Sequence, residues 1–355
     1  MLCEGATPAE KEEGVSSRDA ASEQGSRAGH RGQTLRRAWI ELALLIVGLA
    51  VLARLVAGIG EGAIIRVYEL GGPALLLVTA PHLLAVLAIT LSWWSVIPRD
   101  RRARVGFARL VPAWLAGDAL NYLLPAATLG GEPTKVRLVR DVLAVADGTA
   151  SVTLARVTDL FGLVAFGALG TACAVALRPD ASDAMLYGGL AGVTVLTLAL
   201  AGAARRGLFG GAAGLIRRVR SKSLPFAGAA DRVDAEVRRF LRDDRRALAT
   251  STAWRTAAWL ATVLELWIVF RLLGLHGSLA ELTAMAGLIA LWNGALFFVP
   301  ARAGTTEGGW LLVAGLFGIA PEVSLVIALL RRFRDTVWAL VGLVALAAFS
   351  VRKED

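Results

Sequence analysis

The sequence predicts an all-α polytopic helical membrane protein with two inverted repeats and broken or re-entrant helices. Of its 355 residues, 56% are hydrophobic and 19% are charged, whereas soluble globular proteins keep about a quarter of their residues charged. The apolar residues fall in blocks long enough to cross a bilayer, which takes about 20 residues per helix. These blocks lack period-two alternation, so we interpret them as helices rather than barrel strands.

The first 37 residues are polar and rich in Ser, Gly, Glu and Arg, which predicts a disordered tail. We expect one transmembrane domain over 38–350 and a short tail over 351–355. Its spans are expected at about 38–59, 73–97, 149–177, 184–204, 253–273 and within 279–350. Arginines precede the first span and crowd the loop at 99–109. The positive-inside rule therefore predicts a multi-pass protein of the cell (inner, cytoplasmic) membrane with a cytoplasmic amino terminus.

A polar insert over residues 205–250 contains twelve Arg or Lys and five Asp or Glu. Its stretches Leu215–Arg220 and Val233–Leu248 have an amphipathic pattern, and such helices can lie on an anionic membrane surface. The alternative is a solvated cytoplasmic loop. Since the basic residues lie in loops between apolar blocks, the net charge of +9 indicates membrane topology, and we expect no nucleic-acid partner.

Two regions, 110–148 and 279–320, begin as apolar helices and are then interrupted. The helix-breaking residues are Pro125, Gly130 and Gly131 in the first region and Pro300 and Gly304 in the second. A carboxylate follows each break, Glu132 in the first region and Glu307 in the second. Broken helices at membrane depth occur where protein or water covers the freed backbone groups. We therefore predict a re-entrant or discontinuous hairpin in each region.

The two regions match each other when one is shifted by 175 residues. The matched pairs are Asp118 with Asn293, Pro125 with Pro300, Glu132 with Glu307, and Arg156 with Arg331. The pair Arg156/Asp159 also has a counterpart in Arg332/Asp335, displaced by one residue. We take the repeat halves as about 73–177 and 253–350.

The charges of the flanking loops predict that these halves are inverted. The first broken region follows the Arg-rich loop at 99–109, and the second follows Gly274–Ser278, which lacks Lys and Arg. The two regions should thus be entered from opposite sides of the membrane. Inverted repeats with broken helices are a transporter architecture.

Polar and ionisable residues of the broken regions and of the helices that follow them are the candidate substrate-pathway residues, because a charge in a membrane segment is costly and faces a cavity or a partner. The set comprises Asp118, Asn121, Glu132, Arg156, Asp159, Asn293, Glu307, Arg331, Arg332 and Asp335. Each has a simpler alternative. Glu132 and Glu307 can stabilise helix amino termini, and Arg156 and Asp159, three apart on one helical face, can neutralise each other. Asp118 and Asn293 can hydrogen-bond neighbouring helices.

An arginine cluster near residue 331 offers a second kind of candidate site. Arg331, Arg332 and Arg334 can hold a lipid phosphate, because the guanidinium group donates in a bidentate fork. The alternative is that these arginines anchor the helix at the membrane interface.

Two strings resemble the signatures of a known family. One is Asn121-Tyr-Leu-Leu-Pro-Ala-Ala-Thr-Leu-Gly-Gly-Glu132, followed by Arg137-Leu-Val; the other is Val299-Pro-Ala-Arg-Ala-Gly-Thr-Thr-Glu307-Gly-Gly, followed by Leu-Phe-Gly-Ile and Arg331-Arg332. Both are similar to the lysylphosphatidylglycerol synthase transmembrane region, or flippase-like domain family, over roughly 38–350. The resemblance implies movement of lipids between leaflets.

Full synthases of that family also carry a cytoplasmic aminoacyl-transferase domain after the membrane region. The last apolar block here is followed directly by Asp355, so we expect a stand-alone membrane domain and no transfer of lysine to lipid. The glycine-glutamate strings are also similar to a subset of the family associated with hopanoid biosynthesis.

Three function classes remain open at this level. The first is a lipid flippase or transporter with a membrane lipid as substrate. The second is a membrane-embedded lipid-modifying transferase, and the third is a scaffold for a lipid, for example hopanoid, biosynthesis complex. We expect no enzyme activity, no catalytic residues, no cofactor and no metal, because the two Cys and three His lack ligand spacing and no Gly-Lys-Ser/Thr phosphate motif is present. The oligomeric state stays open.

A mechanistic hypothesis follows from the repeat. Both halves are expected to enclose one partly hydrated cavity, with Glu132 and Glu307 facing it from opposite halves and Arg156 and Arg331 nearby. Charges of both signs around one cavity lower the cost of burying each of them. Replacement of either glutamate by Gln is expected to impair lipid movement without unfolding the protein.

Overall fold

The computed structural model describes residues 61–123, 131–177, 242–296 and 304–351, with isolated positions at 188, 191, 192, 194, 195, 235, 237–240, 299 and 302. In this part of the chain every regular element is a helix, which confirms the all-α prediction. In chain order the helices are α2 Glu61–Glu69, α3 Gly71–Thr79, α4 His82–Val96, α5 Arg99–Val105, α6 Phe107–Leu123, α7 Glu132–Val139, α8 Val145–Leu177, α12 Arg245–Leu272, α13 Leu279–Ala295, α14 Thr305–Leu316 and α15 Pro321–Val351.

Three helical runs are long and apolar enough to cross a membrane: Gly71–Val96, Val145–Leu177 and Arg245–Leu272. They coincide with the spans predicted at 73–97, 149–177 and 253–273, and the chain is a polytopic helical membrane protein. The spans predicted at 38–59 and 184–204 lie outside the described residues. Pro81 interrupts the first run between α3 and α4, because proline lacks the N–H that would continue the helix.

Two boundaries differ from the sequence prediction. The Arg-rich segment at 99–109 forms helix α5 and the start of α6, where a loop was expected. Helix α12 begins at Arg245, inside the predicted 205–250 insert. The side chain of Asp244 caps α12 by accepting a hydrogen bond from the Ala247 N–H at 3.0 Å. A capped amino terminus extends the helix beyond its apolar block.

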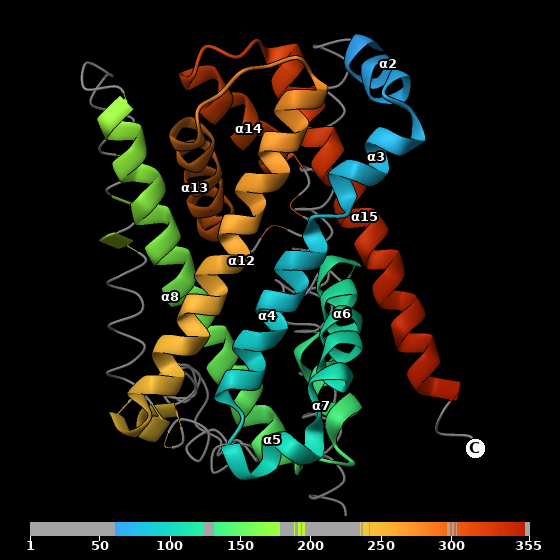
Figure 1. Cartoon of the computed structure of the whole chain (residues 1–355), viewed down its shortest axis with the longest axis vertical. Helices are drawn as coiled ribbons and strands as arrows, with labels where there is room; N and C mark the ends of the chain where they lie inside the picture. Colours follow the sequence, from blue (N-terminus) through green and yellow to red (C-terminus); the bar gives the residue numbers. More distant parts are fainter. Residues whose placement is uncertain are drawn as a thin grey trace, which may run out of the picture.

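The first helix break is confirmed between α6 and α7, and it forms a hairpin. Helix α6 ends at Leu123, and α7 begins at Glu132. Arg109 near the start of α6 donates to the Leu138 carbonyl near the end of α7, with 3.4 Å between the two atoms. Helix α7 therefore runs back alongside α6 toward the end of the molecule where α5 lies (Figure 1).

The second helix break lies between α13, which ends at Ala295, and α14, which begins at Thr305. The Trp292 indole donates to the Thr305 carbonyl at 2.8 Å, which ties the end of α13 to the start of α14. This hairpin lies at the end of the molecule opposite α5 and the α6–α7 hairpin (Figure 1). The inverted repeat itself stays a prediction.

Each hairpin packs in its own hydrophobic core. Leu110, Ala113 and Leu138 of the first hairpin belong to one buried cluster, whereas Leu282 and Trp310 of the second belong to another. Buried apolar side chains in contact supply most of the packing energy of such helices. The cores therefore hold both helix breaks in place inside the bundle.

The two long helices that follow the hairpins each pack against the other hairpin. Helix α8 crosses α13 where Gly170 meets Gly287, and a Cβ on either glycine would lie 2.7 Å from the Cα of the other. Helix α15 crosses α6 where Gly342 lies against the Leu115 carbonyl. Small residues let membrane helices approach this closely. The long helices thereby carry their own polar residues into the middle of the molecule.

Candidate functional site

A cavity of about 300 Å³ opens among α4, α6, α8, α12, α13 and α15. Nine of the predicted pathway residues line it: Asp118, Asn121, Glu132, Arg156, Asp159, Asn293, Arg331, Arg332 and Asp335. They come from sequence positions more than 200 residues apart and converge here because the two hairpins and the two long helices cross. Of the predicted helix-break residues, Gly131 and Gly304 each precede a returning helix, whereas Pro125, Gly130 and Pro300 lie outside the described residues.

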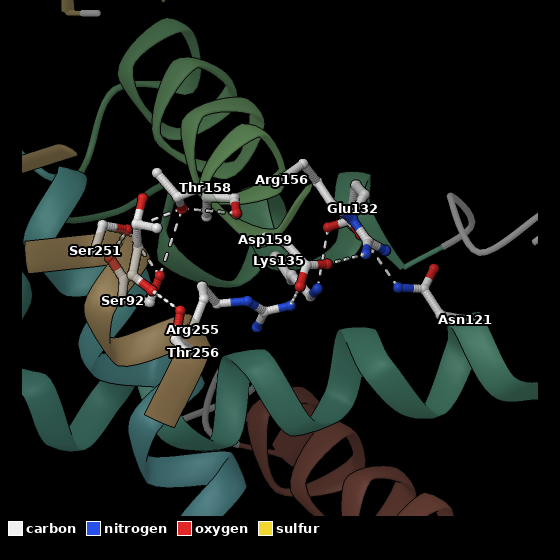
Figure 2. Close-up of polar contacts among 12 residues, drawn as sticks. Ser92, Asn121, Glu132, Lys135, Arg156, Thr158, Asp159, Ser251, Arg255 and Thr256 are labelled. Atoms are coloured by element: carbon white, nitrogen blue, oxygen red, sulfur yellow. Dashed lines mark hydrogen bonds and ion pairs between the residues drawn. The ribbon is translucent and has the colours of Figure 1, made fainter. Parts of the chain in front are cut away.

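Glu132 is the centre of the charge network on the first hairpin (Figure 2). It stands in the first turn of α7, where a carboxylate is favoured by the helix dipole. The Arg156 guanidinium of α8 donates to Glu132 Oε1 at 2.8 Å through Nε and lies 2.6 Å from it through Nη2. The Lys135 ammonium lies 3.1 Å from Oε2. Glu132 is therefore held by two cations from two helices.

Asn121 on α6 fixes the position of the glutamate. Its side-chain oxygen accepts a hydrogen bond from the Gly131 N–H at 2.7 Å, and its amide nitrogen donates to Glu132 Oε1 at 3.2 Å. One asparagine thus closes the α6–α7 hairpin and orients the carboxylate at the same time. An asparagine near the end of α6 therefore stabilises both the hairpin and the position of Glu132.

Asp159 extends the network from α8 to α12. It accepts from Arg156 at 3.4 Å and forms an ion pair with Arg255 of α12. The alternative that Arg156 and Asp159 only neutralise each other is too simple, because each also pairs with a third residue. The charges of α7, α8 and α12 therefore form one continuous chain, in which each ion offsets the burial cost of its neighbour.

A cluster of hydroxyl groups lies beside this chain (Figure 2). Ser92 of α4 and Ser251 of α12 are 2.7 Å apart, and Ser251 donates to Thr158 of α8 at 2.9 Å. Interhelical hydrogen bonds of this kind join helices in an apolar environment. The cluster holds α4, α8 and α12 together directly behind Asp159.

The second hairpin has an ion pair of its own. Glu307, in the first turn of α14, accepts from Arg332 of α15 at 2.7 Å, and Arg332 also donates to the Arg302 carbonyl at 2.7 Å. Glu307 is fully buried and does not line the cavity. The expectation that both glutamates face the cavity is thus wrong for Glu307, because α14 and Arg332 enclose its carboxylate.

Glu265 on α12 joins α4 and α15. Its carboxylate pairs with Arg334, lies 3.0 Å from His82 Nδ1, and lies 3.7 Å from Arg331 Nη1. Arg334 also contacts Asp335 at 2.5 Å. His82 is therefore a partner of a buried carboxylate as well as a residue beside a proline kink.

The ion pairs follow the match that is displaced by one residue, in which Arg332 is the counterpart of Arg156. Glu132 pairs with Arg156, 24 residues later, and Glu307 pairs with Arg332, 25 residues later. The match of Arg156 with Arg331 is therefore wrong as an equivalence of contacts. Arg331 instead lies over the Trp310 ring, with 5.4 Å between its guanidinium carbon and the ring centroid.

Three cations of the cavity wall were missed by sequence reasoning: Lys135, Arg255 and Arg302. Lys135 follows Glu132 by three positions, which places both on one face of a short helix. Arg255 lies inside a predicted span, where any ionisable residue marks a candidate site. Arg302 lies inside the second broken region, 279–320, where the same rule makes it a candidate.

The described residues hold no group of three or more His, Cys, Asp and Glu side chains arranged to bind a metal ion. The cavity chemistry seen here is ionic and hydrogen-bonding. The wall thus presents donors and acceptors of both charges to the cavity.

Comparison with known proteins places the chain in a family. The model of the lysylphosphatidylglycerol synthase TM region matches residues 39–343. A relative named UPF0104 membrane protein, from Methanothermobacter thermautotrophicus, is 24% identical over 312 residues, which cover 81% of this chain and 89% of the relative. No solved structure matches the chain. The match covers both hairpins and every helix that lines the cavity, and the protein belongs to the lysylphosphatidylglycerol synthase TM region family.

Proposed function

We propose that this membrane protein moves a polar lipid between the two leaflets of the cell membrane. The head group crosses through the cavity while the acyl chains stay in the bilayer. The observation that carries this proposal is the cavity wall: a space of about 300 Å³ is lined by carboxylates and cations next to the breaks of two membrane hairpins. Charged residues inside a membrane protein typically mark such a pathway.

The arrangement of the hairpins supports transport. Helices α6 and α13 are each 17 residues long, and the long helices α8 and α15 have 33 and 31 residues. Each long helix packs on the hairpin of the other half. These correspondences favour the inverted repeat that the sequence predicts. In transporters with that architecture, the repeats rock around a site at their interface.

We place α5 on the cytoplasmic side, because Arg99, Arg101, Arg102 and Arg104 cluster in it, and the amino terminus on the same side, because arginines precede the first predicted span. A cysteine introduced at Ala103, which is exposed on α5, should react with an impermeant maleimide only after the cytoplasmic face is opened. Reaction in intact cells would reverse the topology. The 205–250 insert would then bind the anionic inner surface through its basic residues.

Transport is favoured over a lipid-modifying reaction because the cavity ions pair with one another. Glu132, Arg156, Asp159 and Arg255 form a continuous chain of ion pairs. Such a chain can exchange partners with a passing head group without any bond being made or broken. We accordingly propose no catalytic residue and no cofactor.

The test is lipid movement in reconstituted vesicles. The purified protein is placed in phosphatidylglycerol–phosphatidylcholine vesicles with trace acyl-chain-labelled lipid, and dithionite quenching measures how fast label reaches the outer leaflet. Glu132→Gln should lower the rate about tenfold, since a charge-assisted hydrogen bond is worth about 1.5–3 kcal/mol. Glu322→Gln is the matched control, because Glu322 is exposed at the start of α15.

Asp118→Asn provides a second test with less risk of unfolding. Asp118 lines the cavity, and no ion pair within 4.0 Å joins it to another of the described residues. Its replacement should slow lipid movement while the unfolding temperature stays that of the parent. Parent protein that moves no labelled lipid, or a Glu132→Gln/Asp118→Asn double variant with the parent rate, would refute the proposed function.

A further inference from the structure

The two charged clusters around the cavity differ in net charge. The first cluster joins the α6–α7 hairpin to α8 and α12, and it has three cations and three carboxylates: Lys135, Arg156, Arg255, Asp118, Glu132 and Asp159. Each of these cations has a carboxylate within ion-pair distance. This side of the cavity is therefore electrically balanced without a ligand.

The second cluster joins the α13–α14 hairpin to α12 and α15. It has four arginines and three carboxylates: Arg302, Arg331, Arg332, Arg334, Glu265, Glu307 and Asp335. With His82 neutral, the cluster has one positive charge more than its carboxylates balance. All four of its arginines line the cavity, whereas Glu265 and Glu307 lie behind the wall. The surplus positive charge therefore lies on the side of the cluster that lines the cavity.

Arg331 is only weakly paired in this wall. Its nearest carboxylate oxygen, on Glu265, is 3.7 Å away, and no hydrogen bond from its guanidinium to the described residues is present. The Glu265 carboxylate already accepts a hydrogen bond from Arg334 and contacts His82. The Trp310 ring covers one face of the Arg331 guanidinium, and N–H groups lie in the plane of that group rather than on its face. Arg331 therefore lines the cavity with donors that find no hydrogen-bond acceptor among the described residues.

Arg302 adds a second free cation beside it. It lines the cavity, and no carboxylate of the described residues lies within 4.0 Å of its side chain. Its backbone is tied to the same site, because the Arg302 carbonyl accepts from Arg332 at 2.7 Å. Arg331 lines the same cavity. Two like charges facing one cavity repel unless an anion lies between them.

From this imbalance we infer that the cavity selects a lipid with a net negative head group, whose phosphate is held between Arg331 and Arg302. This inference rests on the proposed lipid movement. Phosphate oxygens accept the paired N–H groups of a guanidinium fork, which suits Arg331 better than a carboxylate at 3.7 Å does. A zwitterionic head group would bring its own cation into a wall that already has a surplus of positive charge.

The test compares two labelled lipids in vesicles of the same composition. Acyl-chain-labelled phosphatidylglycerol and phosphatidylcholine are followed in separate phosphatidylcholine vesicles that contain the protein. Phosphatidylglycerol should cross at least about tenfold faster, as expected for one charge-assisted contact. Arg331→Gln and Arg302→Gln should each slow phosphatidylglycerol more than phosphatidylcholine, so that the preference falls severalfold. Arg302 is exposed, so its variant is informative even if Arg331→Gln folds poorly.

The matched control is Arg271→Gln. Arg271 also lies over a tryptophan, 5.2 Å from the Trp267 ring centroid, but it belongs to the outer end of α12 and not to the cavity. Its replacement should leave the preference intact. Equal rates for both lipids in the parent protein, or an unchanged preference in both cavity variants, would overturn the inference while leaving lipid movement established.

Binding measurements separate the lipid from free phosphate and from transport. In detergent, short-chain phosphatidylglycerol should raise the unfolding temperature of the parent and not of Arg331→Gln. Inorganic phosphate at the same concentration should have little effect on the unfolding temperature. An equal effect would show that the site binds free phosphate and not specifically a lipid head group. Selective phosphatidylglycerol binding through Arg331 without any lipid movement would support the phosphate-binding site at Arg331 and Arg302 and refute the proposed function.

Discussion

The two hairpins look alike in sequence, yet they use their glutamates differently. In both, a carboxylate in the first turn of the returning helix pairs with an arginine of the following long helix. The Glu132 side chain is 15% exposed and lines the cavity, whereas the Glu307 side chain is 0% exposed. The same ion pair therefore borders the cavity in the first hairpin and is an internal anchor in the second.

The hairpins also close by different packing. In α6–α7 two glycine backbones meet, because Gly131 lies against the Gly117 carbonyl. In α13–α14 a tryptophan fills the corresponding space: the Trp292 ring lies against Gly309 and donates to the Thr305 carbonyl. In both hairpins the repeated helix–break–helix pattern determines the path of the backbone. The neighbouring helices then decide what each break is used for.

The largest expected effect tests the anchor. Glu307→Gln removes the carboxylate that pairs with the mostly buried Arg332, and breaking a buried pair costs about 3–5 kcal/mol. We expect a clearly lower unfolding temperature in detergent, with part of the loss recovered in the Glu307→Gln/Arg332→Gln double variant. This replaces the sequence-based expectation that Glu307→Gln leaves folding intact. An unfolding temperature equal to that of Glu322→Gln would show that Glu307 is no anchor.

The next effect tests the glycine contact of the first hairpin. A methyl group on Gly131 would overlap the Gly117 carbonyl, and backbone atoms cannot move aside as a side chain can. Gly131→Ala should lower the free energy of unfolding by about 1–3 kcal/mol, the usual cost of overpacking. Gly72→Ala is the control, since a Cβ there would meet nothing within 4 Å. Equal unfolding curves for the two variants would argue against the close contact.

A smaller effect is expected at the corresponding glycine of the second hairpin. Gly304 precedes α14 with φ 72°, a conformation that costs other residues about 1–2 kcal/mol. Gly304→Ala should destabilise the protein by that amount, whereas Gly315→Ala should not, because φ is not positive there and a Cβ would meet nothing within 4 Å. Chemical denaturation in detergent measures both. If the two variants unfold alike, backbone conformation is not the reason for glycine at position 304.

The smallest effect should change sign between two adjacent glycines. A Cβ on Gly308 would meet nothing within 4 Å, so Gly308→Ala should stabilise α14 by about 0.5–1 kcal/mol. A Cβ on Gly309 would lie 2.6 Å from the Trp292 ring, so Gly309→Ala should destabilise. Thermal unfolding of the two variants side by side checks this. The same sign for both would mean that Trp292 does not pack as described.

The helices and their breaks were predictable from the sequence alone. Apolar blocks of about 20 residues and the positions of Pro and Gly are local features, and each acts on the backbone where it stands. The spans at 73–97, 149–177 and 253–273 and the interruptions before Glu132 and Glu307 followed from them. The sequence also singled out nine residues that line the cavity, because a charged or polar side chain in an apolar block is costly wherever it lies.

The pairing of those charges was decided by the tertiary structure. Each residue turns the side chain of a helix by about 100°, so a difference of one position decides whether Arg331 or Arg332 reaches Glu307. Arg255 meets Asp159 only because α12 crosses α8 at that level. Exposure was decided in the same way, since the crossing of the long helices encloses Glu307 and leaves Glu132 at the cavity. The sequence by itself thus determined which residues bear charge at membrane depth, and packing between distant helices determined which of them face a substrate.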